Sequence, residues 1–107
     1  MSTFIHLSDL AEKTLFKGFH AKLIHSDKMT ISYVRIEAGE LLPRHQHPHE
    51  QITNILEGEL EMTIGEETML CKPGTIVIIP SNVPHSGRAV TDCLALDVFQ
   101  PVREDYQ

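Results

Sequence analysis

The sequence predicts an all-β fold, a barrel or sandwich built from seven or more short strands. Apolar and polar residues alternate in short runs, as in Leu60, Met62 and Ile64 against polar neighbours, and such alternation is typical of a strand with one buried face. Turn-forming glycine and proline separate the runs. Since 107 residues suffice for a single core, we expect one domain spanning residues 1–107.

The one helical signal lies at the N-terminus, within residues 1–17. Asp9 and Glu12 stand there at the spacing of a capping box, so we expect one helical turn or a short helix that Gly18 ends. Glu57 and Gly58 have the length and composition of a two-residue hairpin turn. Strands are expected at residues 19–25, 29–37, 51–56, 60–64, 68–71, 75–79 and 93–99.

Charge and composition exclude several classes of partner. A net charge of −6 without any cluster of Lys and Arg argues against nucleic acid, and no apolar run approaches membrane-spanning length. Residues 1–4 lack the basic start and apolar centre of a signal peptide, so we expect a cytoplasmic protein. Cys71 and Cys93 fit no metal-binding or redox spacing, and we expect buried, reduced thiols.

A cluster of histidines indicates a metal site. His45 and His47 are two residues apart, so on a strand both would point to the same face, and Gln51 shares their parity. Imidazole is the commonest side-chain ligand of divalent transition metals. A further ligand should come from a distant part of the chain, where His85 is the candidate. A proline precedes His49, which favours a turn position for it over a ligand.

Two stretches resemble the motifs of the cupin superfamily, residues 39–58 the first motif and residues 74–89 the second. They carry the following residues at matching spacing: Gly39, His45, His47, Gln51 and Gly58, then Gly74, Pro80, Asn82 and His85. The resemblance implies a double-stranded β-helix, or jelly-roll barrel, and one divalent transition metal ion (Zn, Ni, Mn, Fe or Co) on His45, His47, Gln51 and His85. Asn82 stands in place of a glycine, which asparagine replaces most readily because it enters left-handed conformations.

Gln51 departs from the pattern, because many cupins have a glutamate there. Three neutral imidazoles and an amide leave the double positive charge of the ion uncompensated. In a barrel interior this charge favours an anionic ligand, such as a carboxylate or an enediolate. It also suits Lewis-acid chemistry better than oxygen activation.

Residues 96–106 look like the C-terminal signature of the cupins related to KdgF, which convert 4,5-unsaturated monouronates into their linear keto form. This resemblance implies that Asp97, Phe99 and Arg103 line the substrate end of the barrel. Their chemistry agrees: a carboxylate can shuttle a proton, an aromatic ring offers an apolar wall, and Arg103 can hold a uronate carboxylate through two parallel hydrogen bonds. By strand parity, Cys93, Ala95, Asp97 and Phe99 also share one face, which can be the interior of the barrel. As an alternative, Asp97 and Arg103 form a structural ion pair at the barrel mouth.

Three functions are therefore considered. The first is a metal-dependent enzyme that acts on an unsaturated or keto sugar acid by hydration or tautomerisation. The others are an iron- or manganese-dependent dioxygenase and a module that binds a metabolite without turning it over. The expected partner is a small anionic sugar-like molecule, not nucleic acid or membrane. We also expect a homodimer, because residues 4–10 can cover an edge strand of a second copy.

Overall fold

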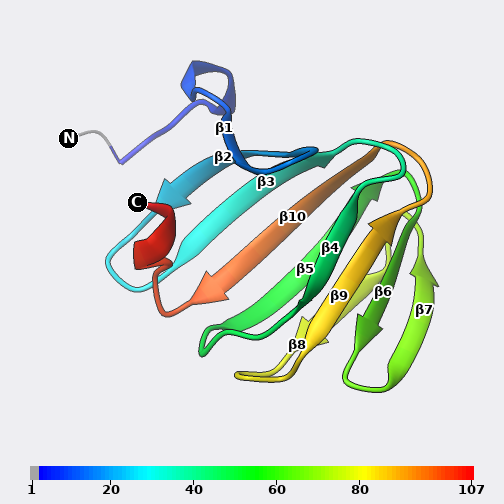
Figure 1. Ribbon diagram of the computed structural model, residues 1–107. Coiled ribbons are helices and arrows are strands. Elements are labelled where there is room, and N and C mark those ends of the chain that lie inside the picture. Colours follow the sequence, from blue (N-terminus) through cyan, green and yellow to red (C-terminus); the bar gives the residue numbers. More distant parts are fainter. Residues whose placement is uncertain (1–2) are drawn as a thin grey trace.

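The computed structural model describes residues 3–107; residues 1 and 2, part of the stretch expected to hold the helical turn, lie outside the described residues. The expected all-β architecture is confirmed (Figure 1). The described strands are β1 (Lys13–Phe16), β2 (Phe19–His25), β3 (Thr30–Ile36), β4 (Leu41–His45), β5 (Glu50–Glu57), β6 (Leu60–Ile64), β7 (Glu67–Cys71), β8 (Ile76–Ile79), β9 (His85–Ala89) and β10 (Cys93–Gln100). Two 3-10 turns accompany them, η1 (Leu7–Asp9) and η2 (Glu104–Tyr106).

The strands form two antiparallel sheets. The larger sheet has the order β1-β2-β3-β10-β5-β8 and the smaller one β4-β9-β6-β7. Side chains from both sheets share one hydrophobic core, in which Phe19 and Val34 of the larger sheet join Leu60 and Met62 of the smaller one. Period-2 alternation explains this core, because every second residue of each strand points between the sheets. Neither 3-10 turn in residues 3–107 is long and apolar enough to cross a membrane.

The N-terminal stretch differs from its prediction. The expected helical turn is present over Leu7–Asp9, before the capping signal at Asp9 and Glu12, but Lys13–Phe16 form strand β1, which was not expected. Gly18 adopts a φ of 79° and turns the chain so that β1 pairs with β2. The backbone groups of β1 find partners in the larger sheet, and this pairing outweighs the local capping signal.

The hairpin expected at Glu57 and Gly58 is wrong. Strand β5 pairs with β10 and β8, whereas β6 pairs with β7 and β9, so this connection carries the chain from one sheet to the other. Gly58 adopts a φ of 83°, and a side chain there would clash with the carbonyl oxygen of Asp92. The glycine is needed at the crossing between the sheets.

The last strand, β10, carries Asp97, one of the candidate site residues. Cys93, Ala95 and Phe99 are buried on its inner face, as the alternation predicts, and Asp97 shares that face. Asp97 lies opposite Thr53 of β5 in the strand register. The inner face of the larger sheet therefore carries a polar patch next to the apolar core. Both cysteines are buried and free, as expected.

Candidate metal centre

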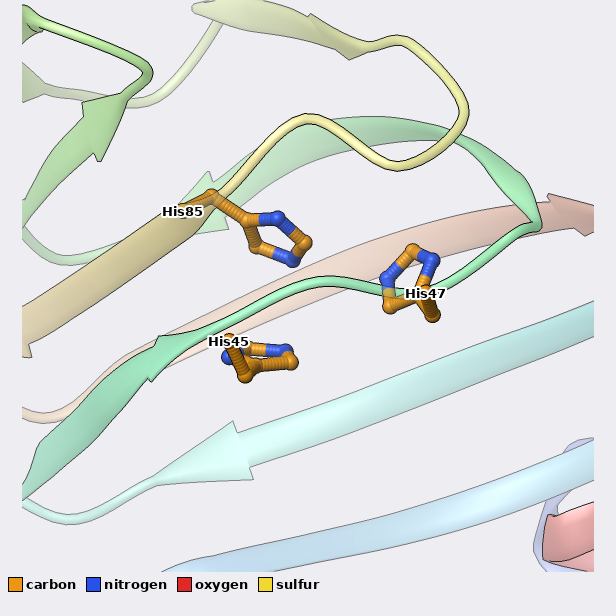
Figure 2. Close-up of side chains that lie close together, drawn as sticks. All are labelled: His45, His47 and His85. Carbon is orange, nitrogen blue, oxygen red and sulfur yellow. The ribbon is translucent and has the colours of Figure 1, made fainter.

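Three histidines from two remote parts of the chain converge, as the sequence predicts (Figure 2). His45 ends β4 and lies opposite His85, which begins the neighbouring strand β9. His47 follows in the connection between β4 and β5, so His45 and His47 do not share a strand. Their rings still lie close together, with centroids 5.8 Å apart. The ring centroids of His45 and His47 lie 4.3 Å and 4.9 Å from that of His85. One ligand nitrogen from each ring lies within 4.8 Å of the other two.

Each of the three rings is oriented by a backbone carbonyl oxygen at its Nδ1. A carbonyl oxygen only accepts hydrogen bonds, so the hydrogen of each neutral ring lies on Nδ1 and leaves the lone pair on Nε2. This arrangement is typical of metal-binding histidines, in which the second nitrogen fixes the ring. The contacts are His45 Nδ1 to Pro43 O at 2.8 Å, His47 Nδ1 to His49 O at 2.9 Å and His85 Nδ1 to Val83 O at 2.9 Å.

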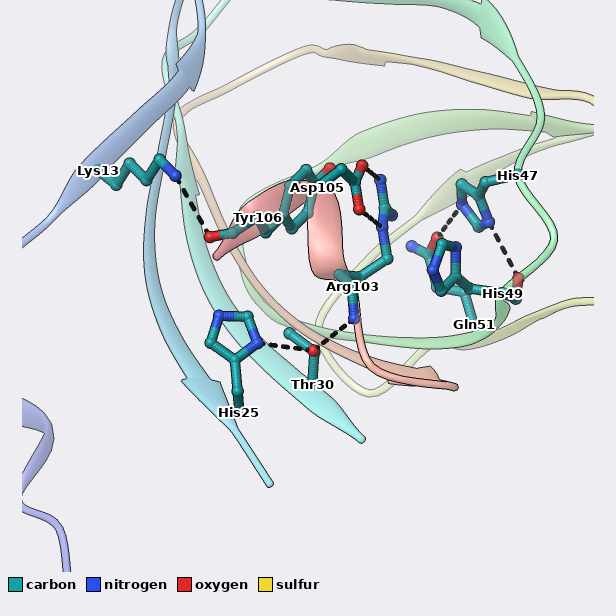
Figure 3. Close-up of polar contacts among 9 residues, drawn as sticks. All are labelled: Lys13, His25, Thr30, His47, His49, Gln51, Arg103, Asp105 and Tyr106. Carbon is teal, nitrogen blue, oxygen red and sulfur yellow. Dashed lines mark hydrogen bonds and ion pairs between the residues drawn. The ribbon is translucent and has the colours of Figure 1, made fainter. Parts of the chain in front are cut away.

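The side-chain amide of Gln51 has a fixed orientation. Thr53 donates its one hydroxyl hydrogen to Oδ1 of Asp97 over 2.7 Å. The oxygen of Thr53 therefore accepts from Nε2 of Gln51 at 2.9 Å. This leaves Oε1 of Gln51 facing Nε2 of His47 at 3.0 Å (Figure 3). Both of these atoms offer lone pairs and neither carries a hydrogen in this arrangement.

A cation between the two acceptors satisfies both. Two ligand atoms that each lie about 2.1 Å from one ion, at the right angle of octahedral coordination, are about 3 Å apart. The contact between His47 and Gln51 has this length. Three Nε2 atoms and one amide oxygen therefore fit a divalent transition metal ion, the set expected from the sequence.

Burial keeps His85 and His47 in the neutral form, which is the form that binds a metal ion. His85 is 1% exposed and His47 is 7% exposed. Desolvation lowers the pKa of His85 from 6.5 to about 4 and also lowers the pKa of His47. Both rings are thus neutral near pH 7, and no proton competes with an ion for their Nε2 atoms.

Asp97 lines the same pocket as the three histidines. Burial raises the pKa of its carboxyl from 3.8 to about 6, and the hydrogen bond from Thr53 acts in the opposite direction. A carboxyl group with a pKa near neutrality can both accept and return a proton. The position is the one that strand parity predicts for Asp97.

Arg103 does not pair with Asp97, so the alternative of a structural ion pair between them is wrong. Its Nε and Nη2 atoms donate to the carboxylate of Asp105 over 3.0 Å and 2.7 Å (Figure 3). The guanidinium carbon lies 4.7 Å from the ring centroid of Phe99 and 4.0 Å from that of Tyr106. The guanidinium is thus held between two rings, and it lines the pocket.

Phe99 was expected to form an apolar wall of the substrate pocket, but its ring lies behind the pocket lining. Its ring is 3% exposed, packs against His47 with 5.8 Å between centroids, and is not among the residues that line the pocket. Its position suits a role in holding His47 and Arg103. The apolar wall is formed by other side chains, among them Leu15, Phe16, Leu42, Leu60 and Met62.

Two residues of the site were missed from the sequence. Thr53 follows Gln51 at a spacing of two on β5, so parity places it on the same face, but its contact with Asp97 depends on the register of β5 against β10. Asp105 is close to Arg103 in sequence, and only the η2 turn brings their charges together. His49 lies in the turn before β5, as predicted, and supplies its carbonyl oxygen, not its ring.

Comparison with known proteins agrees with this description. Residues 32–99 match the family of cupin domains. The solved structure of KdgF from Halomonas sp. superposes with a TM-score of 0.92 at 24% identity and covers 100% of both chains, which shows a shared fold. Dimethylsulfoniopropionate lyase DddQ of Ruegeria pomeroyi is 41% identical over 64 residues, 59% of this chain and 32% of the lyase. H2HPP isomerase of Bacillus subtilis is 40% identical over 57 residues, 50% of this chain and 24% of the isomerase.

Proposed function

The chain belongs to the family of cupin domains, and from this premise we propose that it is a metal-dependent enzyme that converts a 4,5-unsaturated monouronate into its linear keto form. One observation carries the proposal. Three Nε2 atoms and the amide oxygen of Gln51 converge in a pocket that also holds a carboxyl group, Asp97, and a guanidinium group, Arg103.

The proposed metal ligands are His45, His47, Gln51 and His85. A divalent ion held there, Zn, Ni, Mn, Fe or Co, supplies a Lewis acid that polarises an oxygen of the bound substrate. All four side chains are neutral, so the positive charge of the ion is retained and attracts an anionic substrate. This charge supports a sugar acid over a neutral sugar.

Asp97 is proposed to move the proton. The linear keto form is an isomer of the ring form, so the reaction adds and removes no atoms. The hemiacetal hydroxyl loses a proton while the ring C–O bond breaks, and the carbon at the far end of the double bond gains a proton. A carboxyl group with a pKa of about 6 can accept the first proton and deliver the second.

Arg103 is proposed to bind the carboxylate of the substrate. Its Nη1 is the guanidinium nitrogen that Asp105 does not hold, and the ring stack with Phe99 and Tyr106 fixes the direction of the group. A fixed guanidinium loses little freedom when an anion binds. Phe99 therefore acts by holding Arg103 and His47, both of which it contacts.

The two sequence relatives whose names give a reaction favour a reaction without an oxidant. By their names, DddQ is a lyase and the Bacillus subtilis relative is an isomerase, and neither reaction class consumes oxygen. The solved structure that covers the whole of this chain is that of KdgF, the protein whose group residues 96–106 resemble. The dioxygenase alternative requires oxygen uptake, which an oxygen electrode measures with catechol-like substrates or diketones.

An ultraviolet assay tests the proposal. The conjugated double bond of 4,5-unsaturated galacturonate absorbs in the ultraviolet, and metal-loaded protein is expected to speed the loss of this absorbance. Decay at the rate of the protein-free control would contradict the proposed activity. If that substrate binds in calorimetry but is not consumed, the chain is a binding module.

Replacing Arg103 with lysine tests the carboxylate site. Lysine cannot make two parallel hydrogen bonds to Asp105 or stack its head group flat between the rings of Phe99 and Tyr106. We expect KM for the uronate to rise about 10-fold or more, because charge remains but direction is lost. Steady-state kinetics measure this, with Arg88→Lys, at an exposed arginine of the smaller sheet, as the control. An unchanged KM would contradict the assignment.

We also propose a homodimer in which a second copy covers the outer face of the larger sheet. Ile31, Val98, Ile52 and Ile78 lie side by side on four adjacent strands, and Ile52 and Ile78 are 42% and 63% exposed. A two-fold axis can bring this aliphatic row onto the same row of a second copy. Light scattering is expected to give a dimer mass for the natural chain and a monomer mass for Ile78→Lys. A dimer mass for this variant would contradict the proposed face; Met69→Lys, on the smaller sheet, should change nothing.

A further inference from the structure

We infer that Thr53 is a positioning residue that links the metal ligand Gln51 to Asp97, and that this link requires an amide at position 51. The inference deepens the proposed function, since it rests on Gln51 as a ligand. Thr53 is 1% exposed and lies on the inner face of β5, between the two groups that it contacts. A buried hydroxyl with two polar contacts sets the orientation of both partners.

The hydrogen bonds of this network run in one direction, from Gln51 through Thr53 to Asp97. Gln51 Nε2 donates to Thr53 Oγ1 at 2.9 Å, and Thr53 Oγ1 donates to Asp97 Oδ1 at 2.7 Å. The carboxylate can only accept, which assigns the single hydroxyl hydrogen to it. The amide must then present its NH₂ group to Thr53 and its oxygen to His47. Asp97 thus determines, through Thr53 and through its own contact with the Gln51 side chain, which atom of Gln51 faces the histidines.

A glutamate in place of Gln51 disrupts this hydrogen-bond network. Its carboxylate offers acceptors on both sides, so Thr53, with one hydrogen, can serve either the introduced carboxylate or Asp97 but not both. The two carboxylates also repel each other in a buried setting. This explains why an amide stands at the position where the cupin motif often has a charged ligand: the weaker ligand keeps Asp97 oriented.

Cobalt binding tests the role of Thr53 without any assay of turnover. The valine variant Thr53→Val keeps the shape of the side chain and removes the hydroxyl, so Gln51 loses one of the two contacts that orient its amide, the other being its own contact with Asp97. We expect the affinity for Co²⁺, measured by titration with absorption spectroscopy, to fall about 10-fold, the usual effect of removing a partner that orients a ligand. The visible spectrum of the bound Co²⁺ should shift as well.

Two matched variants complete this test. Thr53→Ser keeps the hydroxyl and should restore the affinity and the spectrum. Thr63→Val removes a comparable hydroxyl contact, to Thr68 on the smaller sheet, and should leave Co²⁺ binding unchanged. If Thr53→Val binds Co²⁺ with the natural affinity and spectrum, Thr53 does not position Gln51 and the inference is wrong.

A glutamate variant tests the need for an amide. Gln51→Glu adds a charge to the ligand set, so Co²⁺ should bind about 10-fold more tightly or better. Turnover of the uronate should fall, with kcat reduced about 10-fold or more and KM changed less, because Asp97 loses its orientation. A rise in both affinity and kcat would overturn the need for an amide. If the natural chain has no uronate activity, the proposed function fails, but the cobalt results still decide the role of Thr53.

Discussion

Replacing His85 with alanine is expected to abolish metal binding and, with it, activity. His85 supplies one of three converging Nε2 atoms, and it begins the strand that pairs with the end of β4 at His45. Two imidazoles and an amide remain, too few to retain a transition metal through dialysis. Elemental analysis should find about one ion per natural chain and less than a tenth of that in His85→Ala, with activity reduced in proportion.

The neighbouring His49 provides the control. His49→Ala removes an imidazole close to the site, but the backbone carbonyl oxygen that orients His47 remains. This variant should keep a full metal complement. Circular dichroism spectra of both variants check that the sheets are intact. Retention of the metal by His85→Ala, or its loss from His49→Ala, would show that the wrong histidines have been assigned.

Replacing Asp97 with asparagine is expected to lower kcat by a factor of about 10² to 10⁴ while the metal stays bound. Asparagine can accept the hydrogen bond from Thr53, as the aspartate does, but it cannot take up or deliver a proton. The geometry of the site is thus kept and its acid–base function removed. Elemental analysis and stopped-flow or steady-state kinetics on the same sample measure both properties. A variant with natural kcat would exclude Asp97 as the proton carrier.

The same substitution should stabilise the metal-free protein at neutral pH. The pKa of Asp97 rises from 3.8 to about 6 on folding, so the folded state binds this proton more tightly than the unfolded state. The contribution of the group to stability is therefore fully present below pH 4 and lost as the pH rises through 6. The loss is at most about 3 kcal/mol, the free-energy equivalent of the change from 3.8 to about 6 in the pKa of Asp97.

Urea unfolding of the two metal-free proteins at pH 4, 6 and 8 measures this difference. We expect Asp97→Asn to be more stable than the natural protein at pH 8 by up to about 3 kcal/mol, and the difference to shrink toward zero at pH 4. Other titrating groups, His85 among them, are common to both proteins and cancel in the comparison. A difference that does not change with pH would mean that Asp97 has an ordinary pKa.

The histidine site could be predicted from the sequence because short-range rules place most of it. The spacing of His45 and His47, and the resemblance of the segment around His85 to a second motif, identified the three side chains that meet. Strand parity placed Asp97 on the inner face of β10. These inferences need only the period of a strand and the order of two motifs.

The contacts between strands could not be predicted in the same way. The hydrogen bond from Thr53 to Asp97 depends on the register of β5 against β10, which lie far apart in the sequence. The hairpin expected at Gly58 failed for a related reason, because the next strand joins the other sheet. Local composition marks a turn, but tertiary pairing decides which strand lies on its other side.

X-ray absorption spectroscopy of the zinc- or cobalt-loaded protein tests the central claim most directly. The account predicts that Nε2 of His45, His47 and His85 and Oε1 of Gln51 share one ion. The spectrum should then show a first shell of nitrogen and oxygen atoms at about 2.0–2.2 Å, and outer-shell scattering from three imidazole rings. In Gln51→Leu one oxygen scatterer should disappear and three imidazoles remain. A spectrum with fewer than three imidazoles, or one dominated by solvent oxygen, would contradict the account.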